Sequence, residues 1–219
     1  MILSKRLTYI LSRIPRGGKV VDVGTDHGKI PYELLRRDIC DEVIAVDISA
    51  PSLKKAENLL LTGGFEGRYR CVVGDGLRPL VGENFDTVVI AGMGGMEIIS
   101  ILDETNRANA NRYILSPHHD SEALRRYLVS HGYAINKDVT ISDGKFYDVI
   151  ETEIGQDFLS EDEYKFGRDN LIDRGEDFLE YLRVTLSTYE GLLDVVNDTR
   201  RIQLSTDIDT LRRILYAKE

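Results

Sequence analysis

The first 154 residues alternate short apolar runs with stretches in which apolar residues recur every three or four positions. The short runs have the length and β-branched content of buried strands, whereas the stretches between them have helical periodicity. Strands that alternate with helices predict a parallel sheet covered by helices on its faces. The predicted strands are 20–23, 42–48, 69–73, 87–91 and 112–116, and the predicted helices are 31–37, 50–61, 94–104 and 121–132.

Two further β-like runs, 133–144 and 145–155, meet at Asp143-Gly144. An Asp-Gly pair between alternating runs is a strong hairpin signal. Five strand–helix units closed by a hairpin exceed what a single dinucleotide-binding half requires. The layout is similar to the seven-stranded sheet of the class I methyltransferases, whose last strand runs antiparallel, and we predict an α/β, Rossmann-like domain over residues 1–155.

The pattern changes after Gly155, where strand signals end and apolar residues recur at helical spacing. Spacings of three, four and seven place them on one stripe per helix. A break near Asn197-Asp198-Thr199 predicts an antiparallel helical hairpin, or coiled coil, as a second domain over 156–219. The hairpin could pack on itself and on the main domain, or serve as an arm that grips RNA. The stripe residues are Leu171, Phe178, Leu182, Leu186, Tyr189, Leu193, Val196, Ile208, Leu211 and Leu215.

Composition is that of a soluble globular protein, with 42% hydrophobic and 30% charged residues. No apolar run approaches the roughly 20 residues of a membrane span, and the N-terminus lacks the features of a signal peptide. Cys40 and Cys71 have no metal-binding or redox spacing, which favours a reduced, cytoplasmic compartment. The net charge of −9 argues against a polyanionic partner, but five bases and no acid precede Asp22, so a local basic face is compatible with it.

The loop after the first predicted strand is the first candidate site. The strand ends at Asp22, and the loop continues through Gly24, Asp26, His27 and Gly28. Only two glycines of a GxGxxG pattern remain, and acids beside the pyrophosphate of NAD would repel it. S-adenosylmethionine has a free ammonium group instead, with which Asp22 or Asp26 can pair. The loop therefore favours S-adenosylmethionine, although a tight turn with capping polar residues would also explain it.

Two further acids follow the next two strands. Asp47 ends the second strand, where an acid can accept the ribose hydroxyls of an adenosine, and Ile48 lies beside it. Asp75 and Gly76 follow the third strand, where methyltransferases hold the adenine ring of the cofactor. A helix cap or a glycine turn would explain each alone. Because ligands of open α/β sheets bind at the carboxyl ends of strands, we expect these residues to form one cofactor site.

The loop after the fourth predicted strand is Ala91-Gly92-Met93-Gly94-Gly95. Ala91 and Gly92 are predicted to contact the cofactor. Since no side chain in the loop can accept an N–H, its glycine-rich backbone would instead leave room for a flat ring near the methyl donor. A flexible turn that begins the next helix is an equally good explanation of these glycines.

His118, His119 and Asp120 follow the fifth predicted strand. Side chains of adjacent histidines diverge and spacing supplies no third ligand, so we predict no metal site. Asp120 is predicted to cap the helix that follows it. His27 is the better functional candidate, because it belongs to the cofactor loop itself.

Residues 22–31, Asp-Val-Gly-Thr-Asp-His-Gly-Lys-Ile-Pro, resemble the signature Asp-Ile-Gly-Ser-Asp-His-x-x-Leu-Pro of bacterial tRNA (adenine-22, N1)-methyltransferases. Segments 3–7, 74–77 and 91–95 resemble other blocks of that family, and the similarity spans nearly the whole chain. The resemblance implies methylation of N1 of adenine 22 in the D-arm region of tRNA, with S-adenosylmethionine as donor. The chain departs from the family at Ser116-Pro117-His118, where Gln-Pro-Asn is usual, and at 48–52, which lacks a Gly-Pro pair.

Methylation of adenine N1 needs no general base, because its lone pair is free at neutral pH. The candidate catalytic residues therefore have positioning roles, with the Asp26 carboxylate offsetting charge that moves to the base. A paired target must first be extruded from its helix. The catalytic set is Asp26, His27, Gly92, Met93 and Gly94, and the predicted phosphate contacts of tRNA are Lys5, Arg6, Arg13 and Arg16.

Three other functions remain open from the residues alone. A methyltransferase acting on a small molecule or at another RNA position would share the cofactor loops. An NAD-linked oxidoreductase would retain the acid at Asp47. A non-catalytic tRNA-binding protein could use the same fold without transferring a methyl group.

Overall fold

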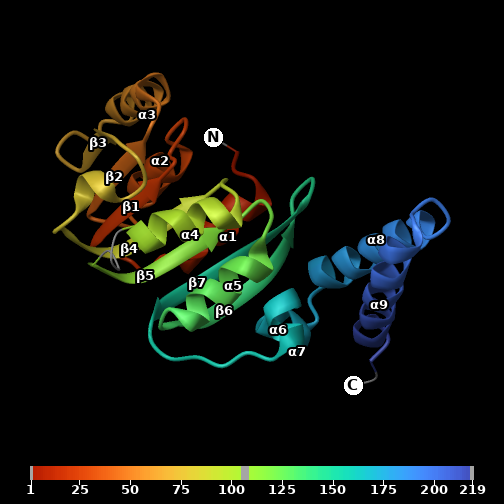
Figure 1. The fold of residues 1–219 in the computed structure, drawn as a ribbon. Coiled ribbons are helices and arrows are strands. Elements are labelled where there is room, and N and C mark those ends of the chain that lie inside the picture. The colour runs from red at the N-terminus through yellow and green to blue at the C-terminus, as the bar shows by residue number, and fades with distance from the viewer. Residues whose placement is uncertain (1, 105–108, 218–219) are drawn as a thin grey trace.

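The computed structural model describes residues 2–104 and 109–217, and its centre is one mixed sheet (Figure 1). The strand order is β3-β2-β1-β4-β5-β7-β6. The first five strands are parallel, and β7 runs antiparallel to both of its neighbours. The strands are β1 Lys19–Val23, β2 Glu42–Asp47, β3 Tyr69–Val73, β4 Asn84–Ala91, β5 Asn109–Ser116, β6 Tyr133–Ser142 and β7 Phe146–Ile154.

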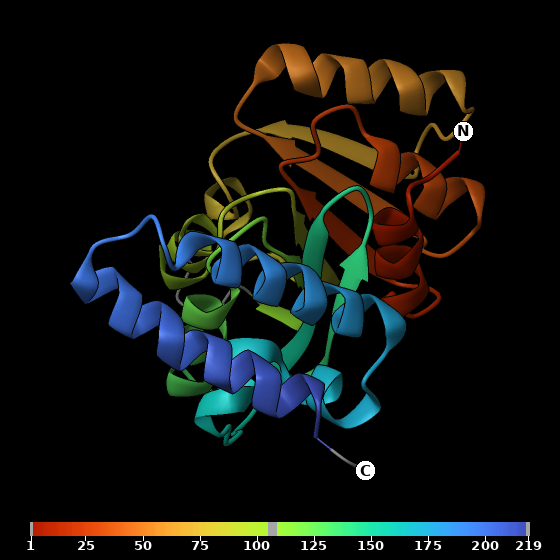
Figure 2. The ribbon, with the colours of Figure 1, turned by 90° about the vertical axis from the view of Figure 1, so that its right-hand side faces the viewer.

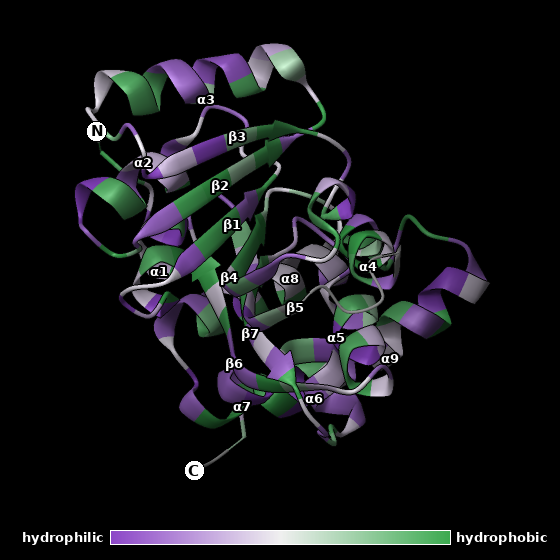
Figure 3. Ribbon diagram, turned by 90° about the vertical axis from the view of Figure 1, so that its left-hand side faces the viewer, coloured by the Kyte–Doolittle hydropathy of each residue, from purple (hydrophilic) through white to green (hydrophobic). Residues whose placement is uncertain are grey.

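Helices cover both faces of the sheet. On one face α1 (Lys5–Arg13), α2 (Lys29–Arg36) and α3 (Ala50–Thr62) pack around Val20, Val43 and Val89. On the other face α4 (Gly95–Glu104) and α5 (Ser121–Ser130) pack against Val21 and Val88. Adjacent residues such as Val20 and Val21 thus enter different cores, as the alternation of side chains along a strand requires. The hydropathy colouring in Figure 3 shows hydrophobic positions running through the central strands, where both faces are buried.

The predicted fold and hairpin are confirmed. All seven predicted strands occur, and the turn at Asp143-Gly144 joins β6 to β7. Helix α2 begins at Lys29, two residues before the predicted start, and helix α1 was not predicted. The predicted cap at Asp120 is wrong: its backbone is left-handed, with φ of 61°, and its side chain makes no capping hydrogen bond. Its carboxylate instead pairs with His119 Nδ1 at 2.7 Å.

The C-terminal residues form four helices, of which the last two make an antiparallel hairpin that projects from the sheet (Figures 1 and 2). Asn197 begins α9 by accepting the Arg200 N–H, at the predicted break. The predicted stripe is largely confirmed, since Phe178, Leu182 and Leu186 of α8 are buried against α9, but the sequence reading omitted the buried residues Leu204 and Ile214 of α9. The four helices are α6 Glu161–Phe166, α7 Arg168–Asp173, α8 Glu176–Leu192 and α9 Asp198–Leu215.

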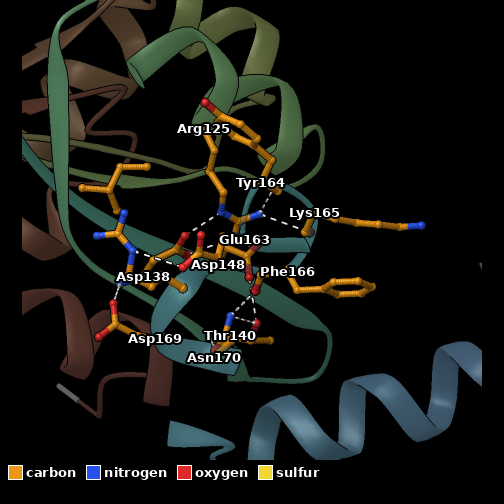
Figure 4. A network of polar contacts seen from close by, with 12 residues as sticks. Arg125, Asp138, Thr140, Asp148, Glu163, Tyr164, Lys165, Phe166, Asp169 and Asn170 are labelled. Carbon is orange, nitrogen blue, oxygen red and sulfur yellow. Dashed lines mark hydrogen bonds and ion pairs between the residues drawn. The ribbon is translucent and has the colours of Figure 1, made fainter. Parts of the chain in front are cut away.

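A buried arginine joins the C-terminal helices to the sheet (Figure 4). The side chain of Arg125 on α5 is fully buried and donates through Nε to Asp138 at 2.6 Å and through Nη2 to Asp148 at 2.9 Å. Its Nη1 donates to the carbonyls of Tyr164 and Lys165 on α6, at 3.3 and 3.4 Å. One guanidinium thus links α5, both strands of the hairpin and the first C-terminal helix.

Further contacts hold the C-terminal helices against the sheet at the same place. Asn170 of α7 accepts the Thr140 N–H at 2.8 Å and donates to the Phe166 carbonyl at 2.7 Å. Gly167 lies so close to the β6 strand that a Cβ there would come within 2.8 Å of the Asp138 carboxylate. The hydrogen bonds and close contact fix α6 and α7 against β6, so the C-terminal unit has a defined position on the sheet.

Candidate functional site

The carboxyl ends of β1, β2 and β4 meet at one edge of the sheet. Val23 of β1 pairs with Val46 of β2 on one side and with Ile90 of β4 on the other. The N–H groups of Gly24 and Thr25 donate to the Val46 carbonyl at 2.8 and 3.1 Å, so the loop leaves β1 across the end of β2. The three predicted loops are therefore neighbours, as expected at this edge of a parallel sheet.

Gly24 has a left-handed backbone conformation that favours glycine, and the end of the Met93 side chain packs against it. Its φ is +72°, and a Cβ there would lie 2.3 Å from the Met93 methyl group. A side chain at this position would displace the flexible end of Met93, and the positive φ would add backbone strain. Met93 thus packs behind the cofactor loop, against the second core, and does not line the cavity in front of it.

A cavity of about 350 Å³ opens at this edge and brings together most of the predicted loop residues. Six predicted cofactor residues line it: Asp22, Gly24, Asp26, His27, Ala91 and Gly92. Six residues that the sequence did not place there also line it: Arg6, Leu7, Thr25, Lys29, Ile30 and His118. The remaining predicted cofactor and catalytic residues lie outside its lining: Asp47, Ile48, Asp75, Gly76, Met93 and Gly94.

Asp22 is the buried acid of the cavity, with 3% of its surface exposed. Burial raises the pKa of Asp22 to about 7, the nearby Thr25 hydroxyl opposes this rise, and the charge of Asp47 adds to it. A cation entering the cavity would favour the ionised carboxylate.

Arg6 enters the cavity from helix α1. Its guanidinium lies over the Tyr147 ring, 4.3 Å from the ring centroid. The Nη1 atom is buried and has no hydrogen-bond partner within residues 2–104 and 109–217. A buried donor without an acceptor is costly, and a ligand carboxylate would remove that cost. The sequence placed Arg6 in a family-like block but gave no sign that α1 would reach the cofactor loop.

Asp26 and His27 form an exposed pair at the cavity mouth. His27 Nδ1 lies 2.6 Å from the Asp26 carboxylate, and the two side chains are 51% and 68% exposed, respectively. The Asp26 N–H donates to Asp47 Oδ2 at 2.9 Å, and the Ser49 N–H donates to Asp47 Oδ1 at 2.8 Å. Asp47 therefore holds the cofactor loop in place, and each of its carboxylate oxygens retains a lone pair for a ligand hydroxyl.

Asp75 and Ile48 lie further along the same edge. Asp75 follows β3 and pairs with Arg78 at 2.9 Å, with about half of its side chain exposed. Ile48 follows β2 and is 73% exposed, unusually high for an isoleucine. Because β3 pairs with β2, the two loops lie side by side beyond the cavity.

His118 lines the cavity from the loop after β5. Its N–H donates to the Met93 carbonyl at 2.8 Å, which ties the loop after β5 to the loop after β4. The imidazole lies 5.6 Å from the Tyr147 ring. Burial and the nearby Arg6 charge lower the pKa of His118, so the ring is neutral at pH 7. The sequence drew attention to His118 through the cluster 118–120 and the departure from the family pattern at 116–118, but it did not place His118 in the cofactor site.

The basic N-terminal residues differ in their surroundings. Lys5 is 58% exposed and pairs with Asp177 at 2.6 Å. Arg13 is 35% exposed and pairs with the buried Glu151, also at 2.6 Å. Arg16 donates to the Asp38 carbonyl at 3.0 Å and is otherwise exposed.

Within residues 2–104 and 109–217, no group of three His, Cys, Asp or Glu side chains is arranged to hold a metal ion. In the same part of the chain, no helix has the length and apolar character needed to cross a membrane.

The chain is similar in sequence to known methyltransferases. Residues 3–150 match the family described as a methyltransferase domain. The chain is 31% identical over 156 residues to the tRNA (adenine(22)-N(1))-methyltransferase of Bacillus subtilis, which covers 70% of this chain and 66% of that relative, just under two thirds of its length. It is 28% identical over 152 residues to a Mycoplasma pneumoniae protein named as a candidate tRNA methyltransferase, covering 67% and 70% of the two chains.

Solved structures extend the similarity to the C-terminal helices. A proposed tRNA (m1A22) methyltransferase of Streptococcus pneumoniae, in complex with S-adenosyl-L-methionine, superposes with a TM-score of 0.90 at 28% identity, over 98% of this chain and 100% of that chain. M. capricolum TrmK, in complex with S-adenosyl-homocysteine, superposes with a TM-score of 0.88 at 26% identity, over 98% of both chains. The chain is therefore similar to the tRNA (adenine(22)-N(1))-methyltransferases over nearly its whole length, and it belongs to the methyltransferase-domain family.

Proposed function

We propose that this protein transfers a methyl group from S-adenosylmethionine to N1 of adenine 22 in tRNA. The observation that carries the proposal is the cavity at the carboxyl ends of β1 and β4. It holds the buried acid Asp22 and an Arg6 Nη1 that has no hydrogen-bond partner among the described residues, in a chain that resembles the m1A22 enzymes over 98% of its length. A tRNA substrate places the enzyme in the cytoplasm.

The residues of the cavity fit the charged groups of this cofactor. S-adenosylmethionine supplies a methyl group on a positively charged sulfur. Asp22 and Arg6 line one cavity and have opposite charges, which suits an amino acid with its ammonium and carboxylate groups. Asp47 would accept from the ribose hydroxyls, with Ile48 beside it, and Asp75 and Gly76 would hold the adenine further along the edge.

The reaction needs alignment more than proton transfer. The N1 lone pair of adenine attacks the methyl carbon, the carbon–sulfur bond breaks, and its electron pair remains on sulfur. No proton moves in this step, so Asp26, His27 and the segment Gly92–Gly94 are proposed to position the reactants. Asp26 would also offset the positive charge that appears on the base.

The tRNA backbone would meet the exposed bases of the N-terminal segment. We propose Lys5 and Arg16 as phosphate contacts, because both side chains are exposed. Arg6 is better placed for the cofactor carboxylate, since its guanidinium faces the cavity. Arg13 is better placed as a structural residue, because it shares the buried carboxylate of Glu151 with Arg112.

The test uses two tRNA transcripts that differ only in carrying A or G at position 22. Incubation with the protein and S-adenosylmethionine should create a primer-extension stop at position 22 of the A transcript alone, because an N1-methyl group blocks base pairing. A stop elsewhere would show another RNA position. Binding of tRNA without any stop would identify a non-catalytic binding protein, and methyl transfer to small molecules without tRNA affinity would identify the third alternative.

A further inference from the structure

A second cavity, of about 320 Å³, lies between the methyltransferase domain and the C-terminal helices. Its walls come from the loop after β5, the β6–β7 hairpin, α6 and α8. His118 lines both this cavity and the cofactor cavity, so the two are neighbours along the same edge of the sheet. We call the second cavity the junction cavity; its volume is at the low end of the range for small-molecule sites.

The junction cavity has aromatic walls. Phe146 of β7 and Tyr181 of α8 meet edge to face, with ring centroids 5.6 Å apart, and Phe166 of α6 completes this side. Aromatic rings at such positions offer faces and edges on which a planar base can stack. Because the rings come from three elements, the cavity exists only when the C-terminal unit is docked.

The polar lining of the junction cavity is mainly acidic. Asp120, Glu122 and Asp148 contribute carboxylates, and the single lysine, Lys165, pairs with Asp207 at 2.6 Å. Each carboxylate has a partner on one side, since Asp120 pairs with His119, Glu122 with Arg126 and Asp148 with Arg125, and each retains lone pairs that can accept from a ligand. They suit a ring that offers N–H donors and gains positive charge, which is what adenine does on methylation at N1.

We propose that the junction cavity is the acceptor-base pocket, which receives the extruded adenine of tRNA. This inference rests on the proposed function and adds the place where the substrate base is held. His118 forms the wall between the base and the cofactor: its Nε2 would be 3.8 Å from a Cβ at Gly92, next to the loop that faces the methyl donor. The base would stack against the aromatic wall of Phe146, Phe166 and Tyr181 and present its N1 edge past His118 and Gly92.

The same network that docks the C-terminal unit also shapes this pocket. Asp148 lines the pocket and is held by Arg125 Nη2 at 2.9 Å and by the Thr140 hydroxyl at 2.8 Å (Figure 4). Lys165 lines it too, and its carbonyl accepts from Arg125 Nη1. The acidic wall is therefore fixed before a base arrives, as a pocket that must align N1 with a methyl group requires.

The test fills the pocket without touching the cofactor loop. Ser121 lines the junction cavity at the start of α5, and Ser130 is exposed at the other end of the same helix. Ser121→Tyr should lower kcat/KM for A22 tRNA by about 100-fold relative to Ser130→Tyr, because the base can no longer reach its place. The affinity for S-adenosylmethionine, by calorimetry, and for tRNA, by filter binding, should stay within about twofold, which also shows that the variant is folded.

A second variant tests the aromatic wall. Phe146→Leu removes a stacking ring and should lower kcat by about tenfold with unchanged cofactor affinity. Wild-type rates in both Ser121→Tyr and Phe146→Leu would overturn the pocket while leaving the proposed function in place. If the wild-type protein itself gives no stop at position 22, the proposed function fails, and the pocket assignment fails with it.

Discussion

Two arginines, Arg125 at the junction with the C-terminal helices and Arg6 in the cofactor cavity, have opposite surroundings. Arg125, at the junction with the C-terminal helices, is fully buried, and its Nε, Nη1 and Nη2 all donate to acceptors. Arg6, in the cofactor cavity, lies on a tyrosine ring and has a buried Nη1 without a partner in the described part of the chain. A buried charge whose hydrogen-bonding groups all have partners holds a structure together. A buried donor without a partner is better explained by a ligand that binds there. We therefore interpret the junction around Arg125 as structural and the cavity around Arg6 as a binding site.

The largest change in stability should come from removing the arginine that joins the C-terminal helices to the sheet. Arg125→Met would leave Asp138, fully buried, without its charge partner, and we expect a loss of about 3–5 kcal/mol in the free energy of unfolding. Urea unfolding followed by circular dichroism measures it. The matched control is Arg126→Met, the next residue, whose ion pairs with Glu122 and Glu161 are exposed. Equal destabilisation by the two variants would contradict a structural role specific to Arg125.

At the cofactor cavity, by contrast, removing a buried charge should raise the free energy of unfolding. Because the folded-state pKa of Asp22, about 7, is above the ordinary value of 3.8, its protonated form favours folding. This contribution is fully present below pH 3.8 and is lost as pH rises to 7. At pH 8, Asp22→Asn should therefore be more stable than the wild type, by up to about 4 kcal/mol, as measured by urea unfolding at pH 4, 6 and 8.

The affinity for S-adenosylmethionine should also depend on pH through Asp22. If Asp22 pairs with the cofactor ammonium, the wild-type affinity for S-adenosylmethionine should weaken about tenfold per pH unit below pH 7, since the carboxyl must lose its proton first. The Asp22→Asn variant should bind weakly at every pH. A flat affinity profile for the wild type between pH 5.5 and 8 would remove Asp22 from the ammonium site.

The sequence predicted the sheet and half of the cofactor cavity for physical reasons. Strands buried on both faces read as continuous apolar runs, so β1 and β4 were visible without any tertiary information. Since parallel strands end at a common edge, Asp22, Gly24 and Gly92 could be placed together.

What the sequence could not predict depends on contacts between distant segments. Helix α1 is short and basic, and only its packing on α2, β6 and β7 brings Arg6 to the cavity. Nothing local separates the buried Arg125 from the half-buried Arg126, except that Arg125 lies three residues before the buried Leu128. Asp120 failed as a cap because its left-handed backbone directs its carboxylate to His119.

The smallest effect should come from the exposed bases of the N-terminal segment, which belong to neither arginine environment. Replacing Lys5 and Arg16 with Gln should leave stability almost unchanged, because the Lys5–Asp177 pair is exposed. If both contact tRNA phosphates, the slope of log K against log salt should become shallower by about 2. The control removes the same charge elsewhere, with Lys54→Gln and Lys55→Gln on α3. Equal slopes for the two double variants would show that Lys5 and Arg16 act only through net charge, and the tRNA backbone would then lie on another face.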